Sequence, residues 1–586
     1  MPKIEVNEGL FFSLLGSRME PAALEFALST AKAELDEWNV EGAGGDGMPS
    51  DADRRFSASD RVIKIELNDT NRPDLWSSAG LARALRIKAG GAIPAYPFFS
   101  REGDLRDTTR EVVVEDSVRE VRPFLAGFCV SGKAIDEAFL KEMIQTQEKL
   151  AWNFGRKRKT ISMGLYRSAE ISWPVHYRAV DPRSVSFVPL QETRKMDLLQ
   201  ILAEHPKGRE YAYILEHAAL HPLLLDSRQD ILSYPPIINS AGLGAVQVGD
   251  SDLFIELTGT DLPSVTLAAS IVACDFADFG YTIEPILVKY PYDTPFGRTP
   301  VFPWYFQRSL SVDAGRASRL LGKSLSVEDV AGAIKRLGSR VEIHGQYVSA
   351  WPAEYRNDFL HQVDLIEDVL IGIGMENFAP ERPRDFTIGR LTPIEIFSRK
   401  VKGILVGLGY QEMIYNYLGS GHDYVDRMGI DLSKILKVAN PMTENHEFVR
   451  NSPLPGLLGT ESISSKASYP HRIFEVGKIA FRNPAENYGV STRQYLGFLC
   501  VHGEADFNEI ASHVATLFFY LGRDFEVVEP AEGAEDSRFI PGRQARVLFM
   551  GVEVGVYGEV HPRVLEAWGI GQPAAAAEFD LDMLIG

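Results

Sequence analysis

The segment from Tyr355 to Asp368 carries four carboxylates, Asp358, Asp364, Glu367 and Asp368. The last three stand at spacing i, i+3 and i+4, which places them on one face of a predicted helix. Like charges at this spacing repel each other by about a few tenths of a kcal/mol per pair. A magnesium ion, which prefers oxygen ligands, or a basic partner would offset that repulsion. The alternative interpretation is a solvated acidic face, with Asp358 as a cap near the start of the helix.

The same segment predicts how the helix packs. Apolar residues recur at helical spacing and predict a buried stripe on it: Phe359, Val363, Ile366, Leu370 and Ile373.

Three further patterns match motifs but lack the context that the motifs need. Gly42–Gly47 has the glycine spacing of a dinucleotide fingerprint, yet no helix signal follows it, so we interpret it as a loop. Gly322–Ser324 resembles part of a phosphate loop but reads as the end of one helix and the start of another. His217 and His221 have zinc-ligand spacing, but Pro222 ends the helix, which favours surface or packing histidines. No Ser/His/Asp or Cys/His arrangement is evident.

Length and composition narrow the class of protein. The chain has 586 residues and a formal net charge of −19, so it lacks the overall basic character of many nucleic-acid-binding proteins. Three distant cysteines, Cys129, Cys274 and Cys500, exclude a disulfide framework. No segment has the roughly 20 apolar residues that span a bilayer. The short apolar run Leu10–Leu15 follows acidic rather than basic residues, so we expect a cytoplasmic protein.

The pattern of elements predicts an α+β multidomain chain with four parts. We expect an N-terminal α/β domain over 1–110 with a glycine-rich loop at 41–60, and an α+β domain over 111–290. A small, mostly helical module follows over 302–380, with a helix capped at Ser326. The last part, 385–586, begins with a helix and ends in strands. Arg546–Met550 and Val554–Tyr557 are predicted to pair as a hairpin through Gly551.

Several of these blocks, taken in order, resemble one family. The chain is similar to the β subunit of phenylalanyl-tRNA synthetase in its shorter archaeal/eukaryotic-like form, and the resemblance covers nearly the whole sequence. The matching blocks are Asn71–Leu75 with Gly80–Leu85, Arg156–Gly164, Tyr234–Ser240, Phe254–Asp261, the acidic helix, Asn440–Pro441 with Arg450–Leu458, and Phe539–Arg543 with His561–Pro562.

The resemblance implies a role for the acidic helix. In this family the corresponding pattern supplies a magnesium site shared with the catalytic α subunit, and it falls here on Asp358, Asp364, Glu367 and Asp368. Asp368 stands where the family pattern has a glutamate.

The resemblance also implies an editing site in the domain over 111–290. The family hydrolyses tRNA that has been mischarged with tyrosine, and Glu256 matches the acid that recognises the tyrosine hydroxyl. Asn239 and Ser240 are expected to line the pocket or to position water. An outward strand residue is the alternative for Glu256, and a turn role is the alternative for Asn239.

The remaining implications concern assembly. The small module is expected to be winged-helix-like, and the C-terminal part to be an antiparallel-sheet relative of class II synthetases that lacks the catalytic motifs. The α subunit would then charge tRNA(Phe) with phenylalanine and ATP inside an (αβ)₂ heterotetramer. Arg156–Lys159 could meet the tRNA end, or could be a solvated loop. A freestanding mischarged-tRNA deacylase and a non-enzymatic nucleic-acid-binding scaffold are the competing hypotheses.

Overall fold

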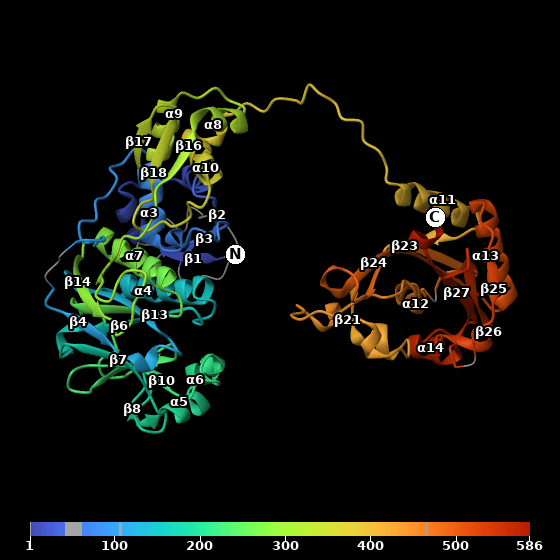
Figure 1. Cartoon of the computed structure of the whole chain (residues 1–586), viewed down its shortest axis with the longest axis horizontal. Coiled ribbons are helices and arrows are strands. Elements are labelled where there is room, and N and C mark those ends of the chain that lie inside the picture. Colours follow the sequence, from blue (N-terminus) through green and yellow to red (C-terminus); the bar gives the residue numbers. More distant parts are fainter. Residues whose placement is uncertain (1, 41–60, 105–107, 465, 532, 586) are drawn as a thin grey trace. The chain divides into compact units, whose positions relative to one another are not determined.

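The computed structural model describes residues 2–40, 61–104, 108–464, 466–531 and 533–585. The chain forms two compact units, Met1–Glu381 and Arg382–Gly586 (Figure 1). The boundary between them lies beside the predicted start of the last part at 385. The glycine-rich segment 41–60 falls outside the described residues.

The N-terminal part of the first unit is a three-stranded sheet with helices. Strands β1 (Lys3–Asn7) and β2 (Ala33–Val40) flank β3 (Arg61–Leu67), and both pairings are antiparallel. Burial alternates along β3, as expected for a strand with one face on the core. Helices α1 (Glu8–Leu15), α2 (Pro21–Ser29) and α3 (Ser78–Lys88) complete this part.

Buried ion pairs join this part to the next one. Arg83 on α3 is 1% exposed and donates to Asp275 at 3.2 Å and to Asp278 at 2.8 Å. Ser78 donates to Glu142 through both its backbone N–H and its hydroxyl. Because buried charges are stable only when paired, these contacts hold the first two predicted domains together within one unit.

The centre of the first unit is a ten-stranded sheet of order β12-β11-β10-β7-β4-β14-β5-β13-β6, with β15 paired to β14. Its strands are β4 (Glu111–Val114), β5 (Phe124–Ser131), β6 (Ile161–Arg167), β7 (Val175–Val180), β10 (His221–Leu225), β11 (Ile231–Tyr234), β12 (Ile238–Asn239), β13 (Leu253–Gly259), β14 (Thr282–Lys289) and β15 (Val301–Phe302). Helix α7 (Leu262–Asp278) packs on β5 and β13, and α4 (Glu137–Lys149) lies nearby (Figure 1). The sheet runs on to Phe302, beyond the predicted end at 290.

The third part of this unit differs from the mostly helical prediction. Helices α8 (Ala314–Leu321), α9 (Val327–Lys335) and α10 (Gln362–Ile373) pack with a three-stranded sheet of β16 (Leu310–Asp313), β17 (Arg340–His344) and β18 (Tyr347–Trp351). Strand β17 alternates polar and apolar residues (Arg340, Val341, Glu342, Ile343, His344), a strand pattern that the prediction of a mostly helical module left out. The cap at Ser326 is confirmed as a capping box with Asp329, and Gly322 ends α8 in the left-handed conformation.

The second unit is a seven-stranded sheet of order β19-β23-β24-β28-β27-β26-β25. The strands are β19 (Gln411–Glu412), β23 (His471–Arg482), β24 (Val490–Val501), β25 (Glu526–Val528), β26 (Phe539–Phe549), β27 (Val552–Val560) and β28 (Ala574–Asp580). All its pairings are antiparallel except that of β19 with β23. The predicted hairpin is confirmed as β26–β27, and it turns at Gly551 with φ 77°.

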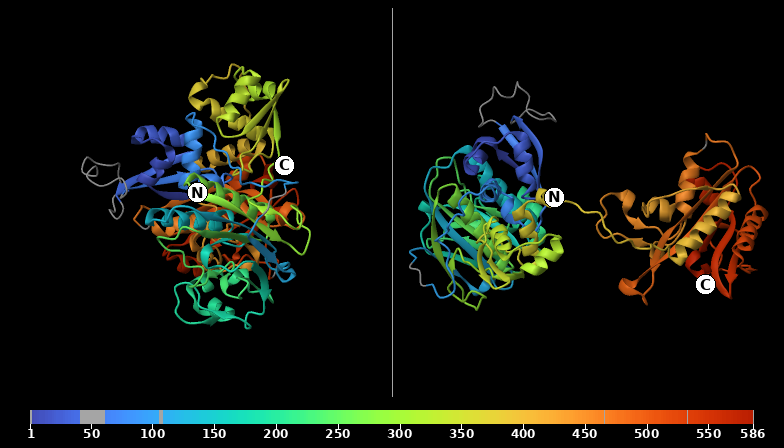
Figure 2. Two further views of the ribbon diagram at one scale, coloured as in Figure 1. Left: turned by 90° about the vertical axis from the view of Figure 1, so that its left-hand side faces the viewer. Right: turned by 90° about the horizontal axis from the view of Figure 1, so that it is seen from above.

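Helices cover both faces of this sheet (Figures 1 and 2). Along β24, Phe498 and Cys500 face the core shared with α11 (Pro393–Gly407) and α13 (Phe507–Leu521). Leu499 and Val501 face the core shared with α12 (Leu454–Ile463) and α14 (Pro562–Trp568). This alternation follows from the two-residue period of a strand. No helix among the described residues is long and apolar enough to cross a membrane.

Candidate functional site

A cavity of about 470 Å³ opens between β6, the β11–β12 segment and helix α4. Its lining combines an apolar wall with polar and charged side chains, among them Glu148, Arg158, Lys207 and Glu256. Apolar lining residues include Leu140, Met143, Ile144, Met163, Leu165, Ile237, Ile238 and Val246. A cavity of this size with an apolar wall suits a ring-bearing ligand whose orientation is set by a few polar contacts.

Glu256 supplies the acidic group of this cavity. It lies on β13, between Gly127 of β5 and Gly164 of β6, and is 1% exposed. The Tyr166 hydroxyl donates to Glu256 Oε2 at 2.9 Å and lies 2.8 Å from the hydroxyl of Ser233, which can donate to it in turn. The sequence prediction placed Glu256 in the pocket, and the structure brings it there.

Burial governs the charge of Glu256. Loss of water raises the pKa of its carboxyl to about 7, although Tyr166 and Arg122 oppose this shift. The group therefore changes between a donor and an acceptor of hydrogen bonds near neutral pH.

Space for this carboxyl depends on Gly164, which the sequence analysis named only as the end of a motif. A Cβ at position 164 would lie 2.1 Å from the Tyr166 hydroxyl oxygen and 2.5 Å from Glu256 Oε2. Only glycine leaves room for both groups, so the end of the Arg156–Gly164 block shapes the acidic end of the cavity.

The other two predicted pocket residues behave differently. Asn239 on β12 lines the cavity, and its amide donates to the Leu165 carbonyl at 3.4 Å. Ser240 is not among the lining residues, and its buried hydroxyl has no hydrogen-bond partner among the described residues. The structure therefore does not bring Ser240 into the lining of the cavity, and a role in positioning water stays a prediction.

The acidic segment is organised by an arginine that the sequence prediction did not use. Arg356 is 1% exposed and holds Asp358 at 3.0 and 2.6 Å and Asp368 at 2.8 and 3.1 Å. Burial opposes the charge of Asp358, but Arg356 and Arg72 together hold its pKa well below the usual range. Burial raises the pKa of Asp368 against the pull of Arg356. The two carboxylates are thus parts of a buried charge cluster.

The two other acids lie apart from that cluster. Asp364 accepts from the backbone N–H groups of Leu360 and His361, both at 2.7 Å, and forms a capping box with His361. Glu367 is exposed and pairs with Lys32 at 2.6 Å. Asp358 therefore does not cap α10, because His361 and Asp364 fill that role.

The predicted buried stripe on α10 is also wrong in part. Val363 is 41% exposed, whereas Leu365 and Val369 are fully buried beside Ile366. The buried face is rotated from the predicted one because Asp368 must point inward to reach Arg356.

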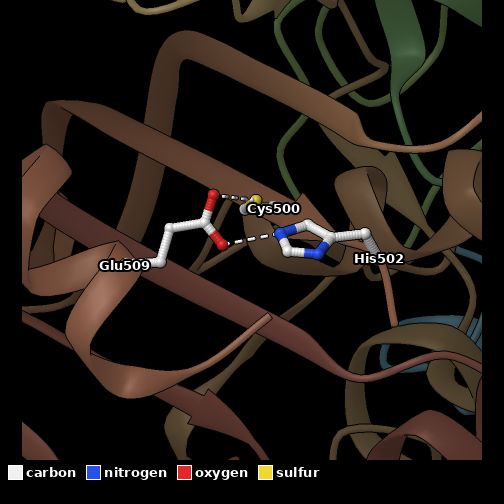
Figure 3. Close-up of side chains that lie close together, drawn as sticks. All are labelled: Cys500, His502 and Glu509. Carbon is white, nitrogen blue, oxygen red and sulfur yellow. Dashed lines mark hydrogen bonds and ion pairs between the residues drawn. The ribbon is translucent and has the colours of Figure 1, made fainter. Parts of the chain in front are cut away.

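The four acids do not converge as a cage for a metal ion. Among the described residues, the one group of three metal-ligating side chains with atoms within 4.8 Å of one another is Cys500, His502 and Glu509 (Figure 3). Asp364 Oδ1 and Glu367 Oε2 accept no hydrogen bond from described residues, so these two acids have lone pairs for an outside cation. Asp358 and Asp368 do not fit direct contact with a metal ion.

The Cys500 cluster is a hydrogen-bonded network (Figure 3). Glu509 Oε2 lies 2.6 Å from His502, and Oε1 accepts from Arg472 at 2.7 Å and from Cys500 at 3.4 Å. Burial raises the pKa of the Cys500 thiol to about 12, so the sulfur is a neutral donor. A guanidinium already neutralises the carboxylate, which leaves little attraction for a metal cation.

Buried arginines of the second unit are likewise neutralised. Arg450 donates to Glu475 at 2.6 Å. Arg538 donates to Asp536 at 2.6 Å and to Glu578 at 2.7 Å. Each of these guanidinium groups is thus paired with a carboxylate.

The histidine pair is not a metal site. His217 is exposed, while His221 lies buried on β10 with Nδ1 2.5 Å from the Tyr234 hydroxyl. The interpretation as surface and packing histidines is confirmed.

Comparison with known proteins places these features in a class. The family model described as the tRNA synthetase B5 domain matches residues 310–375, and that of the phenylalanyl-tRNA synthetase β chain CLM domain matches 381–581. The fold is thus a mixed α/β multidomain architecture built from tRNA synthetase domains.

Relatives narrow the class to one family. The chain is 46% identical to the phenylalanine–tRNA ligase β subunit of Treponema pallidum subsp. pallidum and 42% identical to that of Borrelia hermsii, over 100% of each chain. A crystal structure of an N-terminal fragment of the Pyrococcus horikoshii β subunit matches with TM-score 0.57 and 30% identity, covering 64% of this chain and 99% of that one. The chain belongs to the family of phenylalanine–tRNA ligase β subunits.

Proposed function

We propose that the chain is the β subunit of a phenylalanine–tRNA ligase and removes tyrosine from mischarged tRNA(Phe). The observation that carries the editing role is the apolar cavity with the buried Glu256 carboxyl in its lining. Phenylalanine and tyrosine differ by one hydroxyl. An apolar aminoacylation site discriminates against an amino acid with such an added hydroxyl by only about a hundredfold. A second site that binds the hydroxyl removes the error.

Each part of the cavity has a role in this proposal. The apolar wall takes the ring of the tyrosyl group, and Glu256 as a carboxylate accepts a hydrogen bond from its hydroxyl. Asn239 at the rim holds the polar ester end or its attacking water. Hydrolysis then breaks the ester bond with one water and releases tyrosine and tRNA.

Aminoacylation itself is assigned to an α subunit. The neutralised arginines Arg450 and Arg538 support a second unit that is a silent class II relative and does not hold ATP. We propose an (αβ)₂ heterotetramer of the shorter archaeal/eukaryotic-like type, working in the cytoplasm with ATP, phenylalanine and tRNA(Phe).

A magnesium ion shared with α remains part of the proposal in a reduced form. Asp364 Oδ1 and Glu367 Oε2 would be its contacts from this chain, directly or through water. Asp358 and Asp368 would support the helix through Arg356 rather than bind the ion.

The test uses the chain co-produced with α. Hydrolysis of Tyr-tRNA by the complex should fall about 10- to 100-fold in Glu256→Ala, the loss expected when a charged hydrogen bond is removed. Glu284→Ala, which removes an acid of the same sheet outside the cavity lining, is the matched control. Equal hydrolysis by wild type and Glu256→Ala would exclude Glu256, and failure to co-purify α would favour a freestanding deacylase.

A further inference from the structure

A turn of unusual backbone conformation lies at the rim of the cavity. Arg156, Lys157 and Arg158 are consecutive non-glycine residues with φ 50°, 57° and 67°. The left-handed region costs an L-residue about 1–2 kcal/mol. Such backbone persists only where its surroundings fix it, and it occurs preferentially at functional sites.

The surroundings do fix this turn. Arg122, which is 1% exposed, donates to the carbonyls of Arg158 at 3.3 Å and Lys159 at 3.1 Å. The Tyr213 hydroxyl donates to the Lys157 carbonyl at 3.0 Å. Arg158 in turn donates to the Ile237 carbonyl at 3.0 Å and lies 4.3 Å over the Tyr211 ring. The conformation is thus built into the fold.

The turn presents cations that are left without carboxylates. Arg156, Lys157 and Lys159 are exposed, and none forms an ion pair with a described residue. Glu210, an acid near Arg158, is already paired with Lys207 at 2.9 Å. The positive charge of the turn is therefore free to attract an anion.

Exposed aromatic rings lie beside these cations. Trp152 is 45% exposed and Tyr213 44% exposed, and Lys157 Nζ lies 5.2 Å from the Trp152 ring. Surfaces that bind single-stranded nucleic acid combine cations, which contact the phosphodiester backbone, with aromatic rings, on which the bases stack.

The surface leads into the cavity. Arg158 lines the cavity, and so do Gln147 and Glu148 of α4, one helical turn before Trp152. A strand that stacks on Trp152 would place its end at the opening.

From this arrangement we infer that Trp152, Tyr213 and the turn Arg156–Lys159 bind the single-stranded 3′ end of tRNA and direct its aminoacyl ester into the cavity. Trp152 stacks on a base, and Arg156, Lys157 and Lys159 contact phosphates. This inference rests on the proposed editing function.

The first experiment measures single-turnover hydrolysis of Tyr-tRNA by the α–β complex at increasing enzyme concentration. Trp152→Ala should raise the half-saturating concentration about 5- to 100-fold, the range for loss of one stacked base. The triple variant with Arg156→Glu, Lys157→Glu and Lys159→Glu should raise the half-saturating concentration further. It should also make the affinity less dependent on salt concentration, by about the slope that two phosphate contacts contribute. The rate at saturation and the charging of tRNA with phenylalanine should stay within about twofold, because these residues lie outside the chemistry.

Matched variants test whether position matters. Phe26→Ala removes an exposed ring from α2, and the set Lys133→Glu, Arg183→Glu and Arg308→Glu makes the same change of charge at exposed sites outside the cavity lining. These variants should behave as wild type. Equal effects of both charge-reversal sets, or no effect of Trp152→Ala and the turn variants, would overturn the inference.

A second measurement separates this inference from the editing function. A short single-stranded RNA ending in CCA is titrated against the complex, with Trp152→Phe as the variant that keeps an aromatic face. If the wild type and Trp152→Phe bind it and Trp152→Ala does not, the surface stands even where no Tyr-tRNA is hydrolysed. Hydrolysis of Tyr-tRNA without any effect of these variants leaves the editing function and removes the surface.

Discussion

Glu256 is a carboxyl group that the fold removes from water and places within hydrogen-bond distance of the Tyr166 hydroxyl. The pKa of about 7 means that the native chain keeps a proton which the unfolded chain loses near its ordinary value of 4.5. Ionisation above that value therefore favours the unfolded chain, and stability from this group falls as the pH rises from about 4.5 to about 7.

The variant Glu256→Gln tests this pH dependence. Glutamine does not ionise, so the variant should escape the loss of stability that the wild type suffers as the pH rises. The free energy of unfolding of the variant minus that of the wild type should increase by about 2–3 kcal/mol from about pH 5 to about pH 8. Urea unfolding of the first unit at both pH values measures this gain. A constant difference between the two proteins would show that Glu256 is not a group of raised pKa.

Gly164 gives a second prediction at this scale. In Gly164→Ala the added Cβ would overlap Tyr166 and Glu256, so the carboxyl must move. We expect a loss of stability of about 1–3 kcal/mol and at least about tenfold slower Tyr-tRNA hydrolysis, with phenylalanine charging unchanged. Gly242→Ala is the control, since its Cβ would meet nothing within 4 Å. Unaltered hydrolysis by Gly164→Ala would show that the acidic end of the cavity tolerates displacement.

On helix α10, Asp364 and Glu367 make different contacts, so replacing them should have different effects on stability. Asp364→Ala should destabilise the helix by about 1 kcal/mol, because the Leu360 and His361 N–H groups lose their acceptor. Glu367→Gln removes only an exposed ion pair with Lys32 and should cost less than about 1 kcal/mol. Thermal unfolding without added metal measures both.

The pair of variants then separates capping from metal binding. If a shared magnesium ion contacts Glu367, association of Glu367→Gln with α should lose its dependence on magnesium while stability is retained. Association of Glu367→Gln that responds to magnesium as wild type does would remove this acid from the proposed contacts.

Elements with local signals could be predicted, and those that depend on distant partners could not. The hairpin at Gly551 and the capping box at Ser326 are encoded within a few residues. The inward turn of Asp368 requires Arg356, and Arg83 pairs with Asp275, 192 positions away. Spacing alone predicts that Asp364, Glu367 and Asp368 share one face of the helix. Asp368 instead turns inward to pair with Arg356, which lies outside the helix.

The candidate site follows the same division. The pocket role of Glu256 is predicted from the family resemblance alone. A glutamate on an apolar strand carries no local sequence signal that distinguishes a pocket position from a surface position. Ser240 follows Asn239 directly in the chain, and the sequence does not tell which of the two lines the cavity. The left-handed turn at Arg156–Arg158 could not be predicted, because Arg122 and Tyr213 hold it from elsewhere in the chain.

At the scale of the whole molecule, the division into two units predicts separable functions. The cavity, the acidic helix and the basic turn all lie in Met1–Glu381, and the buried pairs of Arg83 are internal to that unit. Arg382–Gly586 has buried hydrophobic clusters of its own. Each fragment therefore contains the core that it needs to unfold cooperatively.

Fragment 1–381 should then hydrolyse Tyr-tRNA without the rest of the enzyme. We expect a saturating rate within about threefold of the complex, because the residues around the ester are all present, and a half-saturating concentration at least about tenfold higher, because tRNA contacts made by other parts are lost. Near-ultraviolet circular dichroism establishes that the fragment is folded, and its Glu256→Ala variant is the control for contaminating hydrolase. A folded fragment that leaves Tyr-tRNA intact would mean that the site is completed by the second unit or by α. Equal hydrolysis by the fragment and by its Glu256→Ala variant would assign the activity to a contaminating protein.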